Sequence, residues 1–399
     1  MDLAYTPEYD LFREEVRKFL AQQWPAGRPS REERPALERA FRLKAIEAGY
    51  LYRSVPRAYG GSEQSVDLLR AQIIREEFER ARAPMEIQKP GVNMLVPTLL
   101  ERGSEWQKQQ FVARTISGEI SWAQGYSEPA SGSDLASLRT RGELIDGEWV
   151  LNGQKIWSSF ALQANYMFAL IRTEADAPTK HKGISYLLID LKQPGITIRP
   201  LRQMTGGSEF CEVFFDNART PADWIVGERG EGWAVSKSTL KHERSSIGGA
   251  DRTRQRFDRL VALARETIVD GRPLIERPDI RIKLAEISGA LMALKYSSFR
   301  QLSLNAQGES AGIMEMMFKL YATDIGHAIA RTARDVMGEA FMFAPPPEGQ
   351  RGAGPEKFNN QYMGSLGVAI AGGTSNIQRN IIAERGLGLP RDSLMEGGA

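Results

Sequence analysis

The sequence predicts an α+β fold in which helices occupy both ends of the chain and a β-sheet lies between them. Apolar residues recur at helical spacing in the first and last thirds, and short β-branched or aromatic runs fill the middle. Each apolar face must be buried against another element, so we expect three packed regions. They are an N-terminal α-helical domain (1–120), a middle antiparallel β-domain (121–232) and a C-terminal domain resembling a four-helix bundle (233–399).

The N-terminal region shows the helical pattern in several stretches. Phe12, Val16, Phe19 and Leu20 fall at i, i+4, i+7 and i+8, which places them on one face of a helix. Proline and a pair of glycines interrupt the pattern within Val55–Gly61, so we expect a loop there. The remaining helical stretches are Ala36–Ala48, Asp67–Arg82 and Glu105–Thr115.

The middle region changes to short runs separated by turn sequences such as Asp146-Gly147 and Asn152-Gly153. This spacing is typical of a compact antiparallel sheet. The predicted strands are Glu148–Leu151, Tyr166–Arg172, Ile184–Leu191, Thr197–Pro200 and Cys211–Phe215.

In the C-terminal region, apolar residues hold one helical face for four turns, with Pro278 at the start. Glu315–Val336 and Ser375–Arg385 predict two further helices, and the stretch Pro345–Gly354, rich in Pro and Gly, predicts a long loop. The residues on the four-turn face are Ile280, Leu284, Ile287, Leu291 and Leu294.

Composition excludes several classes of protein. The net charge is +2 and the charges are interspersed, so we expect no nucleic-acid partner. No apolar run approaches the ~20 residues that cross a bilayer, and we expect no membrane insertion. Three histidines without metal-ligand spacing and one cysteine make a zinc site improbable. The lone Cys211 and the absence of a secretory signal pattern predict a cytoplasmic protein.

The expected nucleotide-binding motifs are missing. Gly352-Ala-Gly354 and Gly386-Leu-Gly388 lack the third glycine of the dinucleotide fingerprint and do not follow a strand into a helix. No P-loop lysine motif occurs either. Any nucleotide bound here therefore uses neither a Rossmann nor a Walker frame.

The strongest positive signal is the segment Gln124–Ser137, which is rich in small and hydroxyl-bearing residues. Such a loop can bring backbone N–H groups against a planar ring or a phosphate, but by itself it fits an ordinary polar turn equally well. The segment resembles the signature of the acyl-CoA dehydrogenase family almost position for position, and Asn152–Ser159 follows at the family's spacing. Further matches in the same order are Tyr59–Gly61, Gly103–Lys108, Gly207–Phe210 and Gly373–Arg379.

The resemblance implies FAD as the cofactor and assigns roles to single residues. Trp157 would cover one face of the flavin ring, and Ser133 would contact the CoA moiety. Thr374, Ser375 and Asn376 would open a helix whose free N–H groups suit the dinucleotide portion of FAD. Residues expected along the ring edges are Gln124, Gly125, Tyr126 and Ser127 on the pyrimidine side, and Ser158 and Ser159 near N5.

The resemblance also implies the reaction. A base removes the α-proton of an acyl-CoA thioester, and the β-hydrogen leaves as hydride to flavin N5. Many family members carry the basic Glu where this chain has Gly372. A smaller branch carries it on an earlier helix directly before an Arg, so we predict Glu243 as the base and Arg244 as an adjacent positioning cation. The alternative is that Glu243 and Arg244 form a surface pair.

The sequence also departs from the family pattern in a segment that the family uses for assembly. Homotetrameric members donate an Arg-Thr-Phe-Gly segment that grips the FAD pyrophosphate of a neighbour, and here the segment is Ile268–Gly271. Three carboxylates, those of Asp270, Asp335 and Glu339, would repel a pyrophosphate unless they are screened. We therefore expect a second acyl-CoA dehydrogenase-like subunit, in an α2β2 assembly similar to bacterial heteromeric enzymes acting on sterol side-chain thioesters.

Two other functions remain open on this resemblance. The chain could be a non-catalytic or flavin-sharing structural subunit, which the altered segment Ile268–Gly271 favours and an intact Glu243 opposes. It could also be an acyl-CoA oxidase or flavin monooxygenase that uses oxygen. For the dehydrogenase, an electron-transfer flavoprotein is the expected acceptor. Small residues at Ala371 and Gly372 hint at a bulky acyl group.

Overall fold

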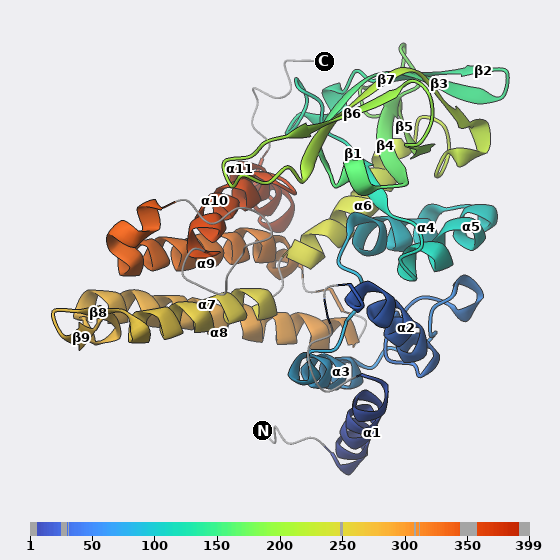
Figure 1. The fold of residues 1–399 in the computed structure, drawn as a ribbon. Coiled ribbons are helices and arrows are strands. Elements are labelled where there is room, and N and C mark those ends of the chain that lie inside the picture. Colours follow the sequence, from blue (N-terminus) through green and yellow to red (C-terminus); the bar gives the residue numbers. More distant parts are fainter. Residues whose placement is uncertain are drawn as a thin grey trace. The chain divides into compact units, whose positions relative to one another are not determined.

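The structure is a computed structural model, and it describes residues 6–24, 30, 32–247, 250–306, 309–310, 312–343 and 357–390. Side chains at 243–252, 302, 305 and 306 lie outside this description. The elements follow the predicted order of helices, sheet and helices (Figure 1). Two compact units result, one of Met1–Arg199 with Phe210–Thr239 and one of Pro200–Glu209 with Leu240–Ala399.

The predicted N-terminal helices are confirmed. In α1 (Pro7–Gln23) a proline occupies the first turn, and Phe12, Val16 and Leu20 form the buried stripe. A capping box between Ser104 and Gln107 starts α5. The other helices before the sheet are α2 (Arg34–Glu47), α3 (Leu68–Ala81), a single π-helical turn (Gly91–Leu95), α4 (Val96–Arg102) and α5 (Glu105–Ile116).

A buried carboxylate joins α1 to α3. Glu77 of α3 is only 2% exposed and accepts hydrogen bonds from Arg13 at 2.9 Å and from Arg17 at 3.1 Å. Burial alone would raise the pKa of Glu77, but the hydrogen bonds from Arg17 and Arg13 outweigh it and lower the pKa. The two helices are therefore held by charge as well as by apolar contact.

The sheet has seven strands in the order β1-β4-β2-β3-β7-β6, with β5 also paired to β4. It is mixed rather than antiparallel throughout, because β1 runs parallel to β4. A parallel pair needs a long connection, and here the β2–β3 hairpin lies between the two strands in sequence. The strands are β1 (Trp122–Gly125), β2 (Arg141–Ile145), β3 (Glu148–Ser159), β4 (Tyr166–Arg172), β5 (Ile184–Asp190), β6 (Ile196–Leu201) and β7 (Phe210–Pro221).

Polar side chains join the sheet to the helices of the first unit. The amide of Gln107 in α5 donates to the backbone oxygens of Asp223 and Ile225, which follow β7. The buried hydroxyls of Thr98 in α4 and Thr239 in α6 (Gly232–Ile247) lie 2.9 Å apart, and the Thr239 hydroxyl also bonds to that of Tyr186 in β5 at 3.4 Å. These contacts explain why the N-terminal helices and the sheet form one compact unit.

The second unit contains the predicted helical bundle. Helices α7, α8, α9 and α10 pack around one apolar core that includes the predicted face of α8 from Ile280 to Leu294. The helix predicted over Ser375–Arg385 is α-helical to Ile381 and ends in a π-helical turn (Ile382–Gly386), and the loop predicted over Pro345–Gly354 lies outside the described residues. The remaining bounds are α6 (Gly232–Ile247), α7 (Ala250–Glu266), α8 (Pro278–Ala306), α9 (Ile313–Met337), α10 (Lys357–Ile370) and α11 (Ser375–Ile381).

No helix in the described part of the chain combines the length and the apolar character needed to cross a membrane. No group of three or more His, Cys, Asp or Glu side chains there could hold a metal ion.

Candidate functional site

Trp157 lies at an irregularity in β3 that turns its indole outward. The pairing of β3 with β7 shifts register between Lys155 and Ser158, and Trp157 adopts a φ of 60°. A bulge of this kind re-aims a side chain, and a bulky residue at positive φ is strained, which is common at functional sites. The Trp157 side chain is 57% exposed, and Phe210 packs against it edge to face at 6.0 Å. The result is an aromatic surface held in a fixed orientation.

The segment Gln124–Ser127 leaves the end of β1. Gln124 and Ser127 are half-buried, whereas the Tyr126 side chain is buried and packs edge to face against the stacked rings of Phe168 and Tyr186. A Cβ at Gly125 would lie 2.4 Å from the sulfur of Met167, so a larger residue there would force the Met167 side chain to shift. This segment can therefore offer its backbone and the side chains of Gln124 and Ser127 to a ligand.

A buried ion pair connects this segment to β3. The Lys155 Nζ lies 2.8 Å from the Glu128 carboxylate and 3.3 Å from the Tyr126 carbonyl oxygen. Glu128 also accepts backbone N–H bonds from Arg139 at 2.6 Å and Thr140 at 2.9 Å. Lys155 is completely buried, and burial lowers its pKa to about 8 although Glu128 favours the charged form.

One backbone bond completes the connection. The Ile156 N–H donates to the carbonyl oxygen of Ser127 at 2.9 Å. Together with the ion pair, this bond fixes the end of the segment Gln124–Ser127 beside the residue that precedes Trp157. The structure thus brings together two of the motifs singled out in the sequence.

Ser158 and Ser159 face opposite sides of β3, as neighbouring strand residues do. Ser158 is fully buried, and its hydroxyl has no hydrogen-bond partner among the described residues. Ser159 is half-buried and Ser133, in the loop after β1, is exposed. Of the two adjacent serines, only Ser159 presents its side chain at the surface of the unit.

In the second unit, Thr374 caps α11. Its hydroxyl accepts the N–H of Ile377 at 3.2 Å, and Ser375 is the first residue of the helix. The preceding turn is held by the buried Lys319, whose Nζ donates to the carbonyl oxygen of Gly373 at 2.7 Å. Thr374, Ser375 and Asn376 therefore open a helix, as expected from the sequence, with Asn376 exposed.

Glu243 and Arg244 lie in α6, but their side chains are outside the described part of the structure. Their predicted roles therefore remain predictions. Gly372, at the alternative position for the base, lies in the turn after α10 and offers no carboxylate.

The segment Ile268–Gly271 forms a tight hairpin, in which Ile268–Val269 (β8) pairs with Arg272–Pro273 (β9). Asp270 and Gly271 have φ values of 51° and 76°, as a two-residue hairpin turn requires. No arginine stands where the family segment carries one.

The carboxylate of Asp335 is screened. It lies 2.9 Å from Lys283 and 2.9 Å from Arg334. Burial alone would raise its pKa, but hydrogen bonds from Lys283 and Arg334 outweigh burial and lower it. Repulsion of a pyrophosphate by Asp335 is accordingly reduced.

The described residues of the first unit fit a flavin. The outward indole of Trp157 offers a planar apolar face, and the half-buried Gln124, Ser127 and Ser159 offer hydrogen-bonding groups. Sequence reasoning missed Lys155 and Glu128, although both lie inside the motifs it used. The strand alternation gave no signal for the burial of Lys155, because its neighbours at i−2 and i+2, Gly153 and Trp157, are both exposed.

Comparisons with known proteins cover nearly the whole chain. Three domain families match in order: "Acyl-CoA dehydrogenase, N-terminal domain" over residues 6–119, "Acyl-CoA dehydrogenase, middle domain" over 123–218, and "Acyl-CoA dehydrogenase, C-terminal domain" over 230–387. Acyl-CoA dehydrogenase IpdE1 of Mycobacterium tuberculosis is 37% identical over 96% of this chain and 98% of its own length. The human mitochondrial short-chain specific acyl-CoA dehydrogenase is 30% identical over 84% of this chain and 79% of its own length.

Two solved structures are similar over the full length. The ChsE4-ChsE5 complex from Mycobacterium tuberculosis contains a chain with a TM-score of 0.77 and 28% identity, covering 98% of this chain and 100% of that one. A chain described as "Tcur3481-Tcur3483 steroid ACAD" has a TM-score of 0.77 and 29% identity, with the same coverage. Both descriptions name two proteins.

The buried ion pair predicts a large effect of Lys155→Met. This change keeps the length of the side chain but leaves the Glu128 carboxylate buried without its cation, so the free energy of unfolding should fall by about 3 kcal/mol in urea titrations at neutral pH. Lys180→Met is the matched control, because the Lys180–Asp134 pair is long (3.6 Å) and both side chains are more than half exposed. Its effect should stay within about 0.5 kcal/mol. Equal effects of the two changes would contradict a stabilising role for the pair.

Proposed function

Because the chain belongs to the acyl-CoA dehydrogenase family, we propose that it catalyses the FAD-dependent α,β-dehydrogenation of an acyl-CoA thioester. The observation that carries the proposal is the exposed Trp157 indole, on a strand that the Ile156–Ser127 backbone bond and the buried Lys155–Glu128 pair fix to the segment Gln124–Ser127. FAD, when bound, would supply the acceptor for the β-hydrogen as hydride. The chain itself supplies binding, orientation and the base.

Residues proposed to bind FAD lie in the first unit and, separately, in the second. In the first unit, Trp157 would contact one face of the ring system, and Ser159 would reach its edge with its side chain. Ser158 is buried and would contribute its backbone only. Residues that would complete the contacts are Gln124, Gly125, Tyr126 and Ser127 in the first unit, and Thr374, Ser375 and Asn376 in the second.

Glu243 is the proposed base. Its carboxylate would take the α-proton, which the adjacent thioester carbonyl acidifies, and hydrogen bonds to the thioester oxygen would stabilise the developing negative charge. Arg244 would position Glu243 as the neighbouring cation. Ser133, exposed in the loop after β1, would contact the CoA moiety.

We further propose that the chain works beside a second acyl-CoA dehydrogenase-like subunit in an α2β2 assembly. Two observations support this: the segment Ile268–Gly271 carries no arginine, and two similar solved structures are described by pairs of proteins. An electron-transfer flavoprotein would reoxidise the flavin. The description of one similar structure as a steroid enzyme favours a bulky, sterol-like acyl group.

Replacing Glu243 with Gln tests the assignment of the base. An amide cannot accept the α-proton, so kcat should fall by at least about a thousandfold while acyl-CoA affinity changes little. The measurement is steady-state turnover with an artificial electron acceptor, together with acyl-CoA binding by calorimetry. Glu266→Gln, in α7, serves as the control and should retain activity. Turnover by Glu243→Gln at the wild-type rate would exclude Glu243 as the base and favour a structural role for this chain.

Flavin content tests the proposed assembly. The chain produced alone should retain little FAD, and coproduction with its second subunit should raise the content to about one FAD per two chains. The ratio is measured by flavin absorbance and by native mass spectrometry. One FAD for every chain in a purified homo-oligomer would contradict the heteromer, and Glu243 would then act in a homo-oligomer.

A further inference from the structure

Three buried hydroxyls from α4, α6 and β5 meet inside the first unit. The hydroxyl oxygens of Thr98 and Thr239 lie 2.9 Å apart, and those of Thr239 and Tyr186 lie 3.4 Å apart. All three side chains are completely buried. None of them has a role in the binding of FAD or CoA, or in the proton transfer, proposed above. We refer to these three residues as the hydroxyl cluster.

Thr239 is the central member of the cluster, because it contacts both of the others. The Thr98 hydroxyl donates its single hydrogen to the carbonyl oxygen of Met94 at 2.7 Å, so the bond to Thr239 uses Thr98 as the acceptor. A buried hydroxyl is costly to leave without a partner. These bonds therefore hold α6 at one depth and one rotation against α4 and β5.

Tyr186 connects the hydroxyl cluster to the segment Gln124–Ser127. Its ring stacks on that of Phe168 with the centroids 6.0 Å apart, and the buried Tyr126 packs edge to face against both rings. Tyr126 belongs to the segment that is proposed to line the flavin. The turn of α6 that carries Thr239 is therefore linked to this segment by two buried tyrosine rings.

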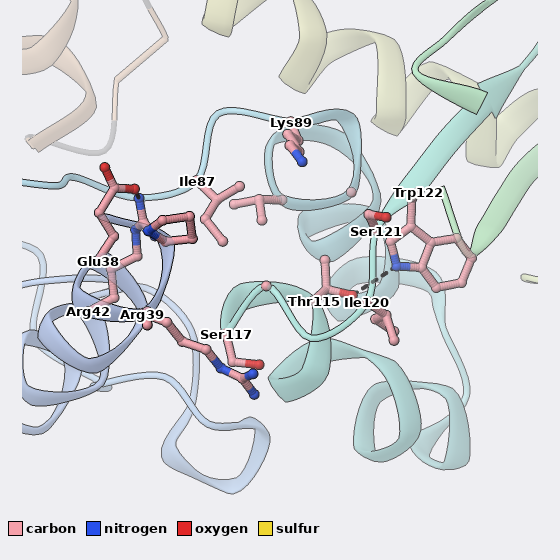
Figure 2. Close-up of a pocket in the computed structure, with 15 residues that line it drawn as sticks. Glu38, Arg39, Arg42, Ile87, Lys89, Thr115, Ser117, Ile120, Ser121 and Trp122 are labelled. Atoms are coloured by element: carbon pink, nitrogen blue, oxygen red, sulfur yellow. Dashed lines mark hydrogen bonds and ion pairs between the residues drawn. The ribbon is translucent and has the colours of Figure 1, made fainter. Parts of the chain in front are cut away.

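Thr98 leads to the same segment by a second route. It lies in α4, which contacts α5. In α5 the Thr115 hydroxyl accepts a hydrogen bond of 2.9 Å from Trp122 Nε1, and Figure 2 shows this bond beside a hollow of the first unit. Trp122 is the first residue of β1, which continues into Gln124–Ser127. Two buried routes thus fix the position of Thr239 relative to the flavin segment.

The helix that the cluster holds also carries the proposed base. Glu243 follows Thr239 by four residues, within a helix that is continuous from Gly232 to Ile247. Positions four residues apart lie on the same face of a helix, one turn from each other. The backbone at Glu243 therefore continues directly from the turn that the hydroxyl cluster fixes.

We propose that Thr239 is a positioning residue for the base, and that the hydroxyl cluster holds α6 in register with the segment Gln124–Ser127. The base on the next turn then meets the α-carbon of a thioester bound against the flavin. A misplacement of about 1 Å can cost roughly a hundredfold in rate, even when binding is unchanged. This inference rests on the proposed function and adds residues that act through Glu243.

Thr239→Val tests the inference, because valine keeps the shape of threonine and removes the hydroxyl. The FAD-loaded assembly is mixed anaerobically with the CoA thioester of a saturated steroid side-chain acid, and flavin reduction is followed by absorbance. Exchange of the α-hydrogen with D₂O, followed by mass with the flavin already reduced, measures the proton step alone. Both rates should fall at least about tenfold, whereas FAD content and the calorimetric Kd of the thioester should change less than about twofold.

Two further variants separate the hydroxyl from the side chain that carries it. Thr239→Ser keeps the hydroxyl, so both rates should stay within about threefold of the wild-type values. Thr98→Val removes the same hydrogen bond from α4. It should lower both rates as Thr239→Val does, and it keeps the inference testable where Thr239→Val does not fold.

Ser236→Ala is the matched control. Ser236 is equally buried on α6, but its hydroxyl donates to the carbonyl oxygen of Trp233 in the same helix, at 2.8 Å. Its loss should leave both rates unchanged. In a Glu243→Gln background, Thr239→Val should lower the residual rate no further, because the two residues act on one step.

Three results would overturn the inference: unchanged rates in Thr239→Val and Thr98→Val, a loss of thioester affinity that accounts for the loss in rate, or a further loss in the Glu243→Gln background. Any of them leaves the proposed function in place. A wild-type protein that binds the thioester but neither reduces its flavin nor exchanges the α-hydrogen contradicts the proposed function instead, so the two failures are distinguishable.

Discussion

The buried ion pair between Lys155 and Glu128 holds the first unit in the form that the proposed chemistry needs. It joins the segment after β1 to the strand that carries Trp157. The backbone N–H groups of Arg139 and Thr140 donate further hydrogen bonds to the two oxygens of the Glu128 carboxylate. Charges are costly to bury, so such a pair persists only where its geometry is well satisfied. With the segment and β3 fixed to one another, the strained backbone at Trp157 can hold an indole outward without a partner ring stacked over it.

The sequence predicted the long helices, in which the apolar periodicity is strong, but it did not predict the shortest strands. The face of α8 from Ile280 to Leu294 and the stripe of α1 were predicted because apolar spacing determines burial. Strands β1 and β2, with four and five residues, were missed, and the parallel pairing of β1 with β4 followed from that omission. Period-2 patterns carry no information about strand direction or about a register shift, so neither the mixed sheet nor the outward turn of Trp157 could be predicted.

For the site, the family resemblance supplied residues that physics alone left ambiguous, and their roles remain predictions. Tyr126 and Ser158 lie in the same motifs as Gln124 and Ser159, yet their side chains are buried, which limits them to backbone contacts. The concern that Asp335 would repel a pyrophosphate is reduced by its ion pairs with Lys283 and Arg334. Side-chain direction and long-range screening depend on tertiary packing, which sequence spacing does not encode.

We propose, above all, that the chain takes part in removing two hydrogens from an acyl-CoA thioester with a bound flavin as acceptor. The most direct test mixes the FAD-loaded protein with a bulky acyl-CoA under anaerobic conditions and follows the visible flavin absorbance and the mass of the thioester. We expect the visible flavin absorbance to be lost, with one α,β-unsaturated thioester formed per flavin. Unchanged absorbance with an intact saturated thioester, for ligands that bind, would contradict it.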